Sequence, residues 1–270
     1  MAQVYPFRAF RYNPDRSPFV RVLTQPYDKI SPAMQEKYYA ADPHNLIAIE
    51  KGRAYPSDTS QNNVYTRAGA AIEDWIRSNV VVQDPAPSFY GYTQEYTVPA
   101  TEERRTRRGF IGAAQLEEYS AGVVFRHEHT LSGPKADRLE LLRHTKTHTG
   151  QLFMLYSDPQ RRIDGILAEA ESAAAPATEM RDEYGVMHRL WVIAAPERVA
   201  SIQKAMEEQK LDCRRASPLR NGAELPQRVP HARRENRSRR SVRASDDDVH
   251  QYAGRRLDDF AGASCGGARS

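Results

Sequence analysis

The sequence predicts an α+β fold, and three observations lead to it. Apolar residues recur at helical spacing between residues 63 and 78, which predicts an amphipathic helix. Residues 88–98 and 109–114 alternate or cluster apolar side chains as sheet strands do. Helix and strand patterns are mixed without strict alternation, and no internal repeat is visible. We therefore expect mixed sheets with packed helices.

The first fifty residues predict two strands and a helix. Residues 4–10 form a short apolar and aromatic run, which indicates a strand. Ser31 is a suitable N-cap and Pro32 suits the first helical position, so a helix is expected to begin here and to end before residue 42. The apolar run at residues 45–50 predicts a buried strand.

The remaining elements follow a predicted hairpin. The strands at 88–98 and 109–114 are expected to pair, with the charged residues 102–108 as their connection. An apolar segment begins at residues 123–125, and Gly133-Pro134 indicates a turn or loop. A helix at 135–148 is followed by a strand, a helix, a strand and a helix, at residues 151–156, 163–173, 188–194 and 196–209.

Composition restricts the classes of function. The net charge of +4 over 270 residues would suggest an anionic partner, but the basic excess comes largely from the C-terminal segment. Residues 1–210 contain no Cys, which excludes disulfides and thiolate metal sites there. No signal peptide and no bilayer-spanning run is visible, so we expect a soluble cytoplasmic protein that does not contact membranes.

The composition changes abruptly after residue 210. Residues 212–270 contain no Lys, many Arg and both Cys residues, Cys213 and Cys265. Residues 212–224 can be encoded by codons that, when read with a shift of one base, translate as IADGHHRYETALN. Residues 247–264 are likewise compatible, one base over, with MTFINMQGEGLTILPAHR. We therefore expect residues 1–210 to be the N-terminal part of a domain and residues 211–270 to be a frameshifted, unstructured tail.

The segment around residues 127–130 carries a candidate polar site. His127 and His129 would share one face of a strand, a spacing compatible with holding a phosphate or a metal ion. The helical His-Glu-x-x-His zinc motif is absent here, so no metal site is assigned. Surface histidines without a ligand are the alternative.

Two further groups could bind an anion or act as a base. Lys135, Asp137 and Arg138 begin the predicted helix, where backbone donors and two cations could converge on a phosphate; an ordinary charged helix start is the alternative. Tyr27 and Asp28 follow a proline in a predicted loop, where the carboxylate could act as a base or bind magnesium, or could simply form a turn.

Residues 1–210 resemble the bacterial and archaeal family catalogued as domain of unknown function 1015. The resemblance rests on many ordered matches, namely Pro6-Phe7 with Ala9 and Arg11, Pro26-Tyr27-Asp28, Asn45-Leu46-Ile47, Phe89 to Gln94, Gly109-Phe110-Ile111-Gly112, His127-Glu128 with Thr130, and Lys135, Asp137 and Arg138. The family's Ala-Asp-Gly-His-His-Arg-Tyr-Glu-Thr motif is expected directly after residue 209. In this chain it occurs only in the shifted frame.

The resemblance implies a function for the intact parent. Its Gly-His-His-Arg turn is similar to the phosphate-facing turn of the ParB and sulfiredoxin superfamily, which includes nucleotide-dependent serine kinases. The implied activity is a nucleotide-dependent phosphotransferase acting on a small molecule, with ATP or ADP and magnesium. Asp28 and Glu128 are then the catalytic candidates, and the candidates for binding substrate or phosphate are Tyr27, His127, Thr130, Lys135, Asp137 and Arg138.

The missing motif leads to two expectations for this chain. We expect it to be inactive, and we expect the lost half to have supplied a strand next to residues 188–194. The alternative is a non-enzymatic ParB-like binding or regulatory module. In either case the Arg-rich tail could bind nucleic acid weakly and nonspecifically.

Overall fold

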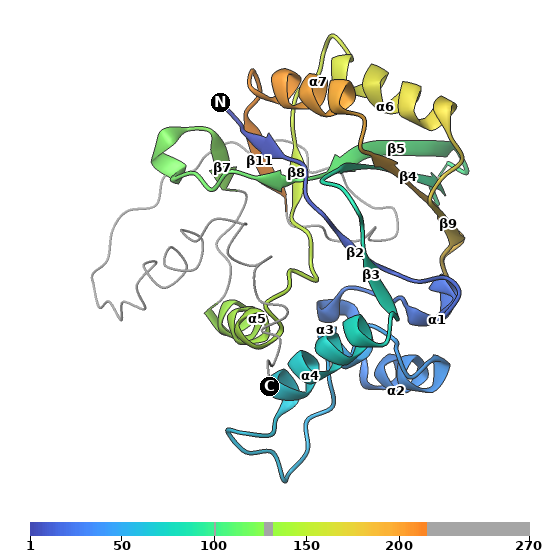
Figure 1. Ribbon diagram of the computed structural model, residues 1–270, viewed down its shortest axis with the longest axis vertical. Coiled ribbons are helices and arrows are strands. Elements are labelled where there is room, and N and C mark those ends of the chain that lie inside the picture. The colour runs from blue at the N-terminus through green and yellow to red at the C-terminus, as the bar shows by residue number, and fades with distance from the viewer. Residues whose placement is uncertain (100, 127–131, 215–270) are drawn as a thin grey trace, which may run out of the picture. The chain divides into compact units, whose positions relative to one another are not determined.

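The computed structural model of the protein describes residues 1–99, 101–126 and 132–214 (Figure 1). All of them lie in the first of two compact units, Met1–Ala223; the second, Glu224–Ser270, is outside the described residues. Helices and sheets are mixed in this unit, which confirms the α+β class. None of the helices in the described ranges combines the length and hydropathy that a bilayer span requires.

The largest sheet of the described residues has four antiparallel strands in the order β5-β4-β10-β9. The predicted hairpin is present as β4 (Phe89–Thr97) and β5 (Arg104–Ile111). Its connection is shorter than expected, because residues 104–108 belong to β5 rather than to the loop. The arginine side chains of residues 104–108 can lie in β5 because one side of an edge strand is open to water.

The strand β10 (Met187–Ile193) pairs with β4 on one side and with β9 (Thr178–Arg181) on the other. The expectation that a lost strand should lie beside residues 188–194 is therefore wrong for residues 188–190, where both sides of the strand are already paired. The helices α6 (Arg162–Ala173) and α7 (Pro196–Met206) lie along one face of this sheet (Figure 1). α7 ends three residues before the predicted boundary. The core beneath these helices includes Phe89, Ile163, Leu167, Ile193 and Ile202.

Three smaller sheets complete the strands that the structure describes. The predicted strand at 4–10 is split into β1 (Val4–Tyr5), paired with β6 (Ala113–Ala114), and β2 (Phe10–Tyr12), paired with β3 (Val81–Gln83). Pro6 follows β1 directly, and its lack of an N–H explains why the first ladder ends there. The third sheet has the order β7-β11-β8, formed by Val124–Arg126, Leu211–Arg214 and Phe153–Leu155.

The strand β11 corrects the expected domain boundary. It comprises the first four residues of the segment that we expected to be unstructured, and it pairs with both β7 and β8. Leu211 is buried in the same core cluster as Phe89. Regular structure therefore continues to Arg214, because an apolar side chain and two strand partners stabilise this stretch.

Two helices confirm the sequence prediction closely. α2 (Pro32–Ala41) begins after Ser31, whose hydroxyl accepts a hydrogen bond from Met34 N at 3.2 Å. α4 (Val64–Arg77) begins after Asn63 with a complete capping box. The short elements near them are α1 (Phe19–Val22), the 3₁₀ turn η1 (Tyr27–Lys29) and, later in the chain, the 3₁₀ turn η2 (Tyr119–Ala121).

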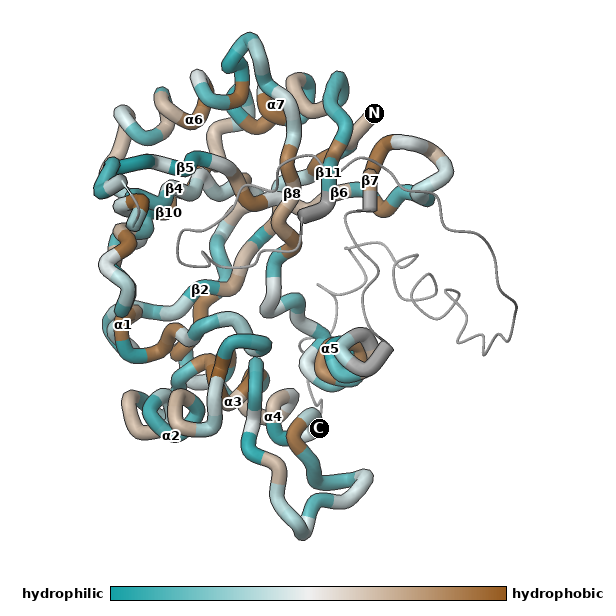
Figure 2. The backbone as a smooth tube through the Cα atoms, turned by 180° about the vertical axis from the view of Figure 1, so that it is seen from behind, coloured by the Kyte–Doolittle hydropathy of each residue, from teal (hydrophilic) through white to brown (hydrophobic). Residues whose placement is uncertain are grey.

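Two predictions in the helical region are wrong. Residues 45–50 form the short helix α3 (Ile47–Glu50), within a hydrophobic stretch of the chain (Figure 2), and not a strand. Asn45 explains this, because its Oδ1 accepts a hydrogen bond from Ile47 N at 2.9 Å and so starts a helical turn. Gly133-Pro134 lies in the first turn of α5 (Ser132–Thr145) rather than in a loop, since a proline needs no hydrogen-bond acceptor there.

Candidate functional site

A cavity of about 160 Å³ lies where α3, α4, α5 and the turn η1 meet. Ile49, Val64 and Leu141 supply its apolar wall. Its polar lining comes from segments far apart in the sequence, namely Tyr27, Glu50, Lys51, Tyr65, Asp137 and Arg138. An apolar pocket with a few convergent polar groups is the usual form of a small-molecule site.

Close packing of α4 against α5 positions two of these residues. Gly69 of α4 meets the α5 backbone so closely that an added Cβ would lie 2.7 Å from the carbonyl oxygen of His144. One turn away, the ring of Tyr65 stacks on His144 with their centroids 5.9 Å apart. Tyr65 Oη then donates a hydrogen bond to Asp137 Oδ1 at 3.0 Å. The absent side chain at position 69 therefore permits the contact that orients Asp137.

Arg138 joins two carboxylates across the cavity. Its Nε and Nη2 donate to Asp137 Oδ2 at 2.9 and 2.7 Å, and its Nη1 donates to Glu50 Oε2 at 3.0 Å. Nη2 also donates to the carbonyl oxygen of Glu50 at 3.1 Å. Because most of its donors are engaged, the guanidinium holds Glu50 and Asp137 in place, and a phosphate would have to displace one of them.

Glu50 has the least satisfied carboxylate in the cavity. The residue is 8% exposed, and its Oε2 accepts the bond from Arg138. Its Oε1 is buried and has no hydrogen-bond partner among the described residues. A buried acceptor without a donor is costly, so native structures rarely keep one that has no role.

Tyr27 and Lys51 form the side of the cavity next to η1. The Tyr27 ring lies under the guanidinium of Arg138, 4.2 Å from Cζ to the ring centroid. Lys51 Nζ donates to the carbonyl oxygens of Tyr27 and Ile30 at 3.2 and 2.6 Å. The lysine therefore fastens η1 to the end of α3. Asp28 belongs to the same turn, but the cavity lining includes only its neighbour Tyr27.

Tyr65 is a hydrogen-bond donor rather than a base. Burial raises the pKa of Tyr65, and its hydrogen bond to Asp137 raises the pKa further. The phenol therefore stays protonated at neutral pH. Asp137 accepts hydrogen bonds from Tyr65 and Arg138 together.

The structure brings together three of the residues that the sequence singled out, Tyr27, Asp137 and Arg138. Lys135 lies in the first turn of α5, although its side chain is outside the description. His127, Glu128 and Thr130 are outside the described residues, so their roles stay predictions.

Sequence reasoning missed Glu50, Lys51 and Tyr65. The signal for Glu50 was a carboxylate at the end of the apolar run 45–50, where a charge has to be paired if the run is buried. Within the described residues no group of three or more His, Cys, Asp or Glu side chains could hold a metal ion. Glu50 and Asp137 are the two carboxylates of the cavity.

The chain was also compared with known proteins. A family model described as protein of unknown function (DUF1015) matches residues 4–212. No curated protein and no solved structure gives a significant match. The family match ends at Asp212, the residue at which the composition of the chain changes.

Proposed function

Because the chain belongs, over residues 4–212, to the family described as protein of unknown function (DUF1015), we propose that it carries the acceptor-substrate site of a nucleotide-dependent small-molecule phosphotransferase. In this chain the frameshifted segment stands in place of the phosphate-binding turn of that enzyme, and the chain is therefore inactive. Three observations support this proposal. The cavity lies between α3, α4, α5 and η1, its lining combines apolar and charged side chains, and the composition of the chain changes at residue 212.

The observation that carries the proposal is that Glu50 Oε1 has no hydrogen-bond partner in the described part of the chain. A phosphotransferase needs a carboxylate that accepts the proton of the attacking hydroxyl, as in kinases, and a buried carboxylate next to a cavity meets this need. In the transfer step the substrate oxygen forms a bond to the terminal phosphorus of the nucleotide. Its proton passes to Glu50 Oε1, and the bond from that phosphorus to the rest of the nucleotide breaks, which releases a nucleoside diphosphate from ATP or a monophosphate from ADP.

The other residues of the cavity position Glu50 and the substrate. Arg138 fixes the carboxylate through Oε2. Tyr65 fixes Asp137, which in turn holds Arg138 from the opposite side. Asp28 and Glu128 remain catalytic candidates from the sequence. The intact parent would use ATP or ADP with magnesium, and its nucleotide phosphates would be bound by the Gly-His-His-Arg turn of the shifted frame.

Calorimetric titration with ATP and magnesium tests the proposal on two proteins. The first is this chain, for which we expect no micromolar binding. The second is the product of the same gene with the reading frame restored by one base at codon 212, for which we expect micromolar binding. A Glu50→Gln variant of the restored protein should keep the nucleotide affinity and lose transfer, since it keeps the shape of the site without the base.

Two results would contradict the proposal. Micromolar nucleotide binding by this chain would show that the segment after residue 212 is not needed. A restored protein that binds no nucleotide would remove the phosphotransferase assignment. The alternative of a ParB-like module with a nucleic-acid-contacting tail depends on residues outside the description, and a salt-dependent DNA affinity that disappears on deleting residues 215–270 would favour it.

A further inference from the structure

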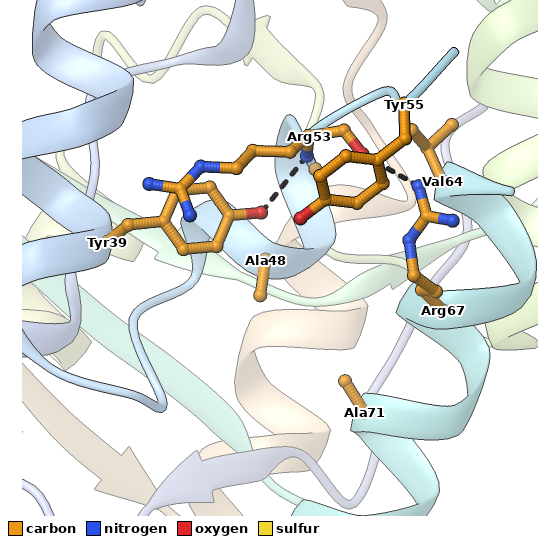
Figure 3. A pocket seen from close by; sticks show the side chains of 8 residues that line it. Tyr39, Ala48, Arg53, Tyr55, Val64, Arg67 and Ala71 are labelled. Atoms are coloured by element: carbon orange, nitrogen blue, oxygen red, sulfur yellow. Dashed lines mark hydrogen bonds between the residues drawn. The ribbon is translucent and has the colours of Figure 1, made fainter. Parts of the chain in front are cut away.

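A second cavity, of about 210 Å³, adjoins the first and shares Gly52 and Val64 with it. Figure 3 shows Tyr39 and Tyr55 entering from opposite sides, with Ala48 and Ala71 beneath them. Arg53 and Arg67 complete the polar lining. None of these four polar residues was singled out from the sequence, and the proposed phosphotransfer uses none of them.

The two cavities differ in the chemistry of their walls. The first contains the carboxylates of Glu50 and Asp137, which accept hydrogen bonds. The polar side chains of the second are two phenols and two guanidinium groups, all of which can donate, and no carboxylate is part of its lining. A wall of hydrogen-bond donors suits an oxyanion.

Arg67 is held firmly at this wall. Its Nη1 and Nη2 donate to the two carboxylate oxygens of Asp58 at 2.7 and 3.0 Å, and Nη2 also donates to the carbonyl oxygen of Arg53 at 2.7 Å. Its Cζ lies 4.9 Å from the centroid of the Tyr55 ring. Arg67 is therefore held in a salt bridge with Asp58 and orders the loop that carries Arg53.

Arg53 is the arginine whose ion-pair partner a ligand can replace. It stacks on Tyr39, with 4.1 Å from Cζ to the ring centroid, and pairs with Glu36. The side chains of this pair are 37% and 63% exposed, and an exposed ion pair contributes little to stability. The ligand's oxygens can therefore replace those of Glu36 at little cost. Tyr39 Oη accepts from Arg53 N at 3.1 Å, which leaves its own proton to donate.

We infer that the cavity formed by Tyr39, Arg53, Tyr55 and Arg67 is a binding site for a small oxyanion, a carboxylate or a phosphate. The anion contacts the Arg53 guanidinium and the two phenol hydroxyls over the floor made by Ala48 and Ala71. Arg67, paired with Asp58, forms the opposite wall. This site does not depend on the proposed phosphotransfer, because its evidence is the second cavity alone.

Calorimetric titration of the full chain with inorganic phosphate, and separately with acetate, tests the inference at constant low ionic strength. We expect binding in the millimolar range, weakened about tenfold by Arg53→Gln, which removes charge-assisted hydrogen bonds. Arg105→Gln is the matched control, since Arg105 is also an exposed arginine paired with a glutamate, and it should leave the affinity unchanged. Tighter binding of phosphate or of acetate identifies the anion that the site prefers.

The variant Ala71→Leu tests whether the anion binds inside the cavity or is only attracted by surface charge. Leucine fills the floor without altering any charged residue, and we expect it to weaken the anion about tenfold as well. Circular dichroism of each variant checks that the fold is retained, and Tyr55→Phe offers a milder variant that removes one donor. Absence of binding at millimolar concentrations, or equal affinity of wild type and Ala71→Leu, would overturn the inference.

Discussion

Two buried carboxylates in this protein have opposite surroundings. Asp84, 4% exposed, receives hydrogen bonds on both oxygens, from Arg11 Nη2 at 2.5 Å, Arg11 Nε at 2.9 Å and Tyr90 Oη at 2.7 Å. Glu50, 8% exposed, has one oxygen bound to Arg138 and one without a partner among the described residues. Burial alone therefore does not distinguish them.

The difference indicates separate roles for the two carboxylates. Asp84 follows β3 and connects Arg11 of β2 to Tyr90 of β4, so its satisfied bonds stabilise three strands. Glu50 ends α3 beside a cavity, where, under the proposed function, a substrate completes its hydrogen bonding. A fully satisfied buried charge serves the fold, whereas a partly satisfied one beside a cavity costs stability and serves a site.

The largest expected effect is that of Asp84→Asn. The substitution leaves the Arg11 guanidinium facing an amide, and removing one partner of a buried pair is strongly destabilising. We expect the free energy of unfolding to fall by about 3 kcal/mol, measured by urea denaturation. Asp74→Asn removes an exposed pair with Arg77 and should leave the stability unchanged; equal losses in the two variants would refute the structural role of Asp84.

Lowering the pH should gradually remove the contribution of Asp84 to the free energy of unfolding. Burial by itself would raise the pKa of Asp84, but the hydrogen bonds from Arg11 and Tyr90 outweigh it and hold the pKa below its ordinary value. The stabilisation is therefore complete above about pH 4, the pKa of an unfolded aspartate, and is lost as pH falls through the folded pKa. The stability difference between wild type and Asp84→Asn should shrink below pH 4, and a constant difference would contradict this.

The next effect concerns the packing that builds the Glu50 cavity. Gly69→Ala places a methyl group 2.7 Å from the carbonyl oxygen of His144 and should destabilise the protein by roughly 2 kcal/mol. Gly165→Ala is the matched control in α6, where an added Cβ meets nothing within 4 Å, and it should stabilise by about 0.5–1 kcal/mol. Thermal unfolding of both variants measures this, and a stabilising Gly69→Ala would show that α4 and α5 can separate freely.

A smaller effect is expected for Tyr65→Phe. The variant removes one hydrogen bond to Asp137 and should lower the free energy of unfolding by about 1 kcal/mol. Tyr184→Phe, at a residue 68% exposed, is the comparison and should have no effect. If Tyr65→Phe is equally neutral, Asp137 does not need the phenol to hold its position.

The sequence predicted the regular elements better than the short ones. The capping residue Asn63 and the apolar stripe that follows it specified α4 locally, so the prediction was confirmed. The run at 45–50 was misassigned because a short apolar run fits a strand and a buried helical turn equally well, and the Asn45 side chain decides between them. β11 was missed because its strand partners are about 60 to 90 residues away in the sequence.

The candidate site was predictable only in part, for a related reason. Tyr27, Asp137 and Arg138 carry polar groups next to turns or helix starts, which made them visible one by one. Their meeting with Glu50 depends on a contact between residues 88 positions apart, which no local pattern encodes. The donor-lined cavity likewise depends on α2, α3 and α4 packing together, so none of its residues was found from the sequence.

The stability of Glu50→Gln tests most directly whether the two carboxylates serve different purposes. Glutamine keeps an oxygen that can accept from Arg138 and removes a buried charge that is only half satisfied. The account predicts a free energy of unfolding within about 1 kcal/mol of wild type, or higher, under conditions in which Asp84→Asn loses about 3 kcal/mol. A loss for Glu50→Gln as large as that for Asp84→Asn would show that Glu50 serves the fold, and would contradict the account.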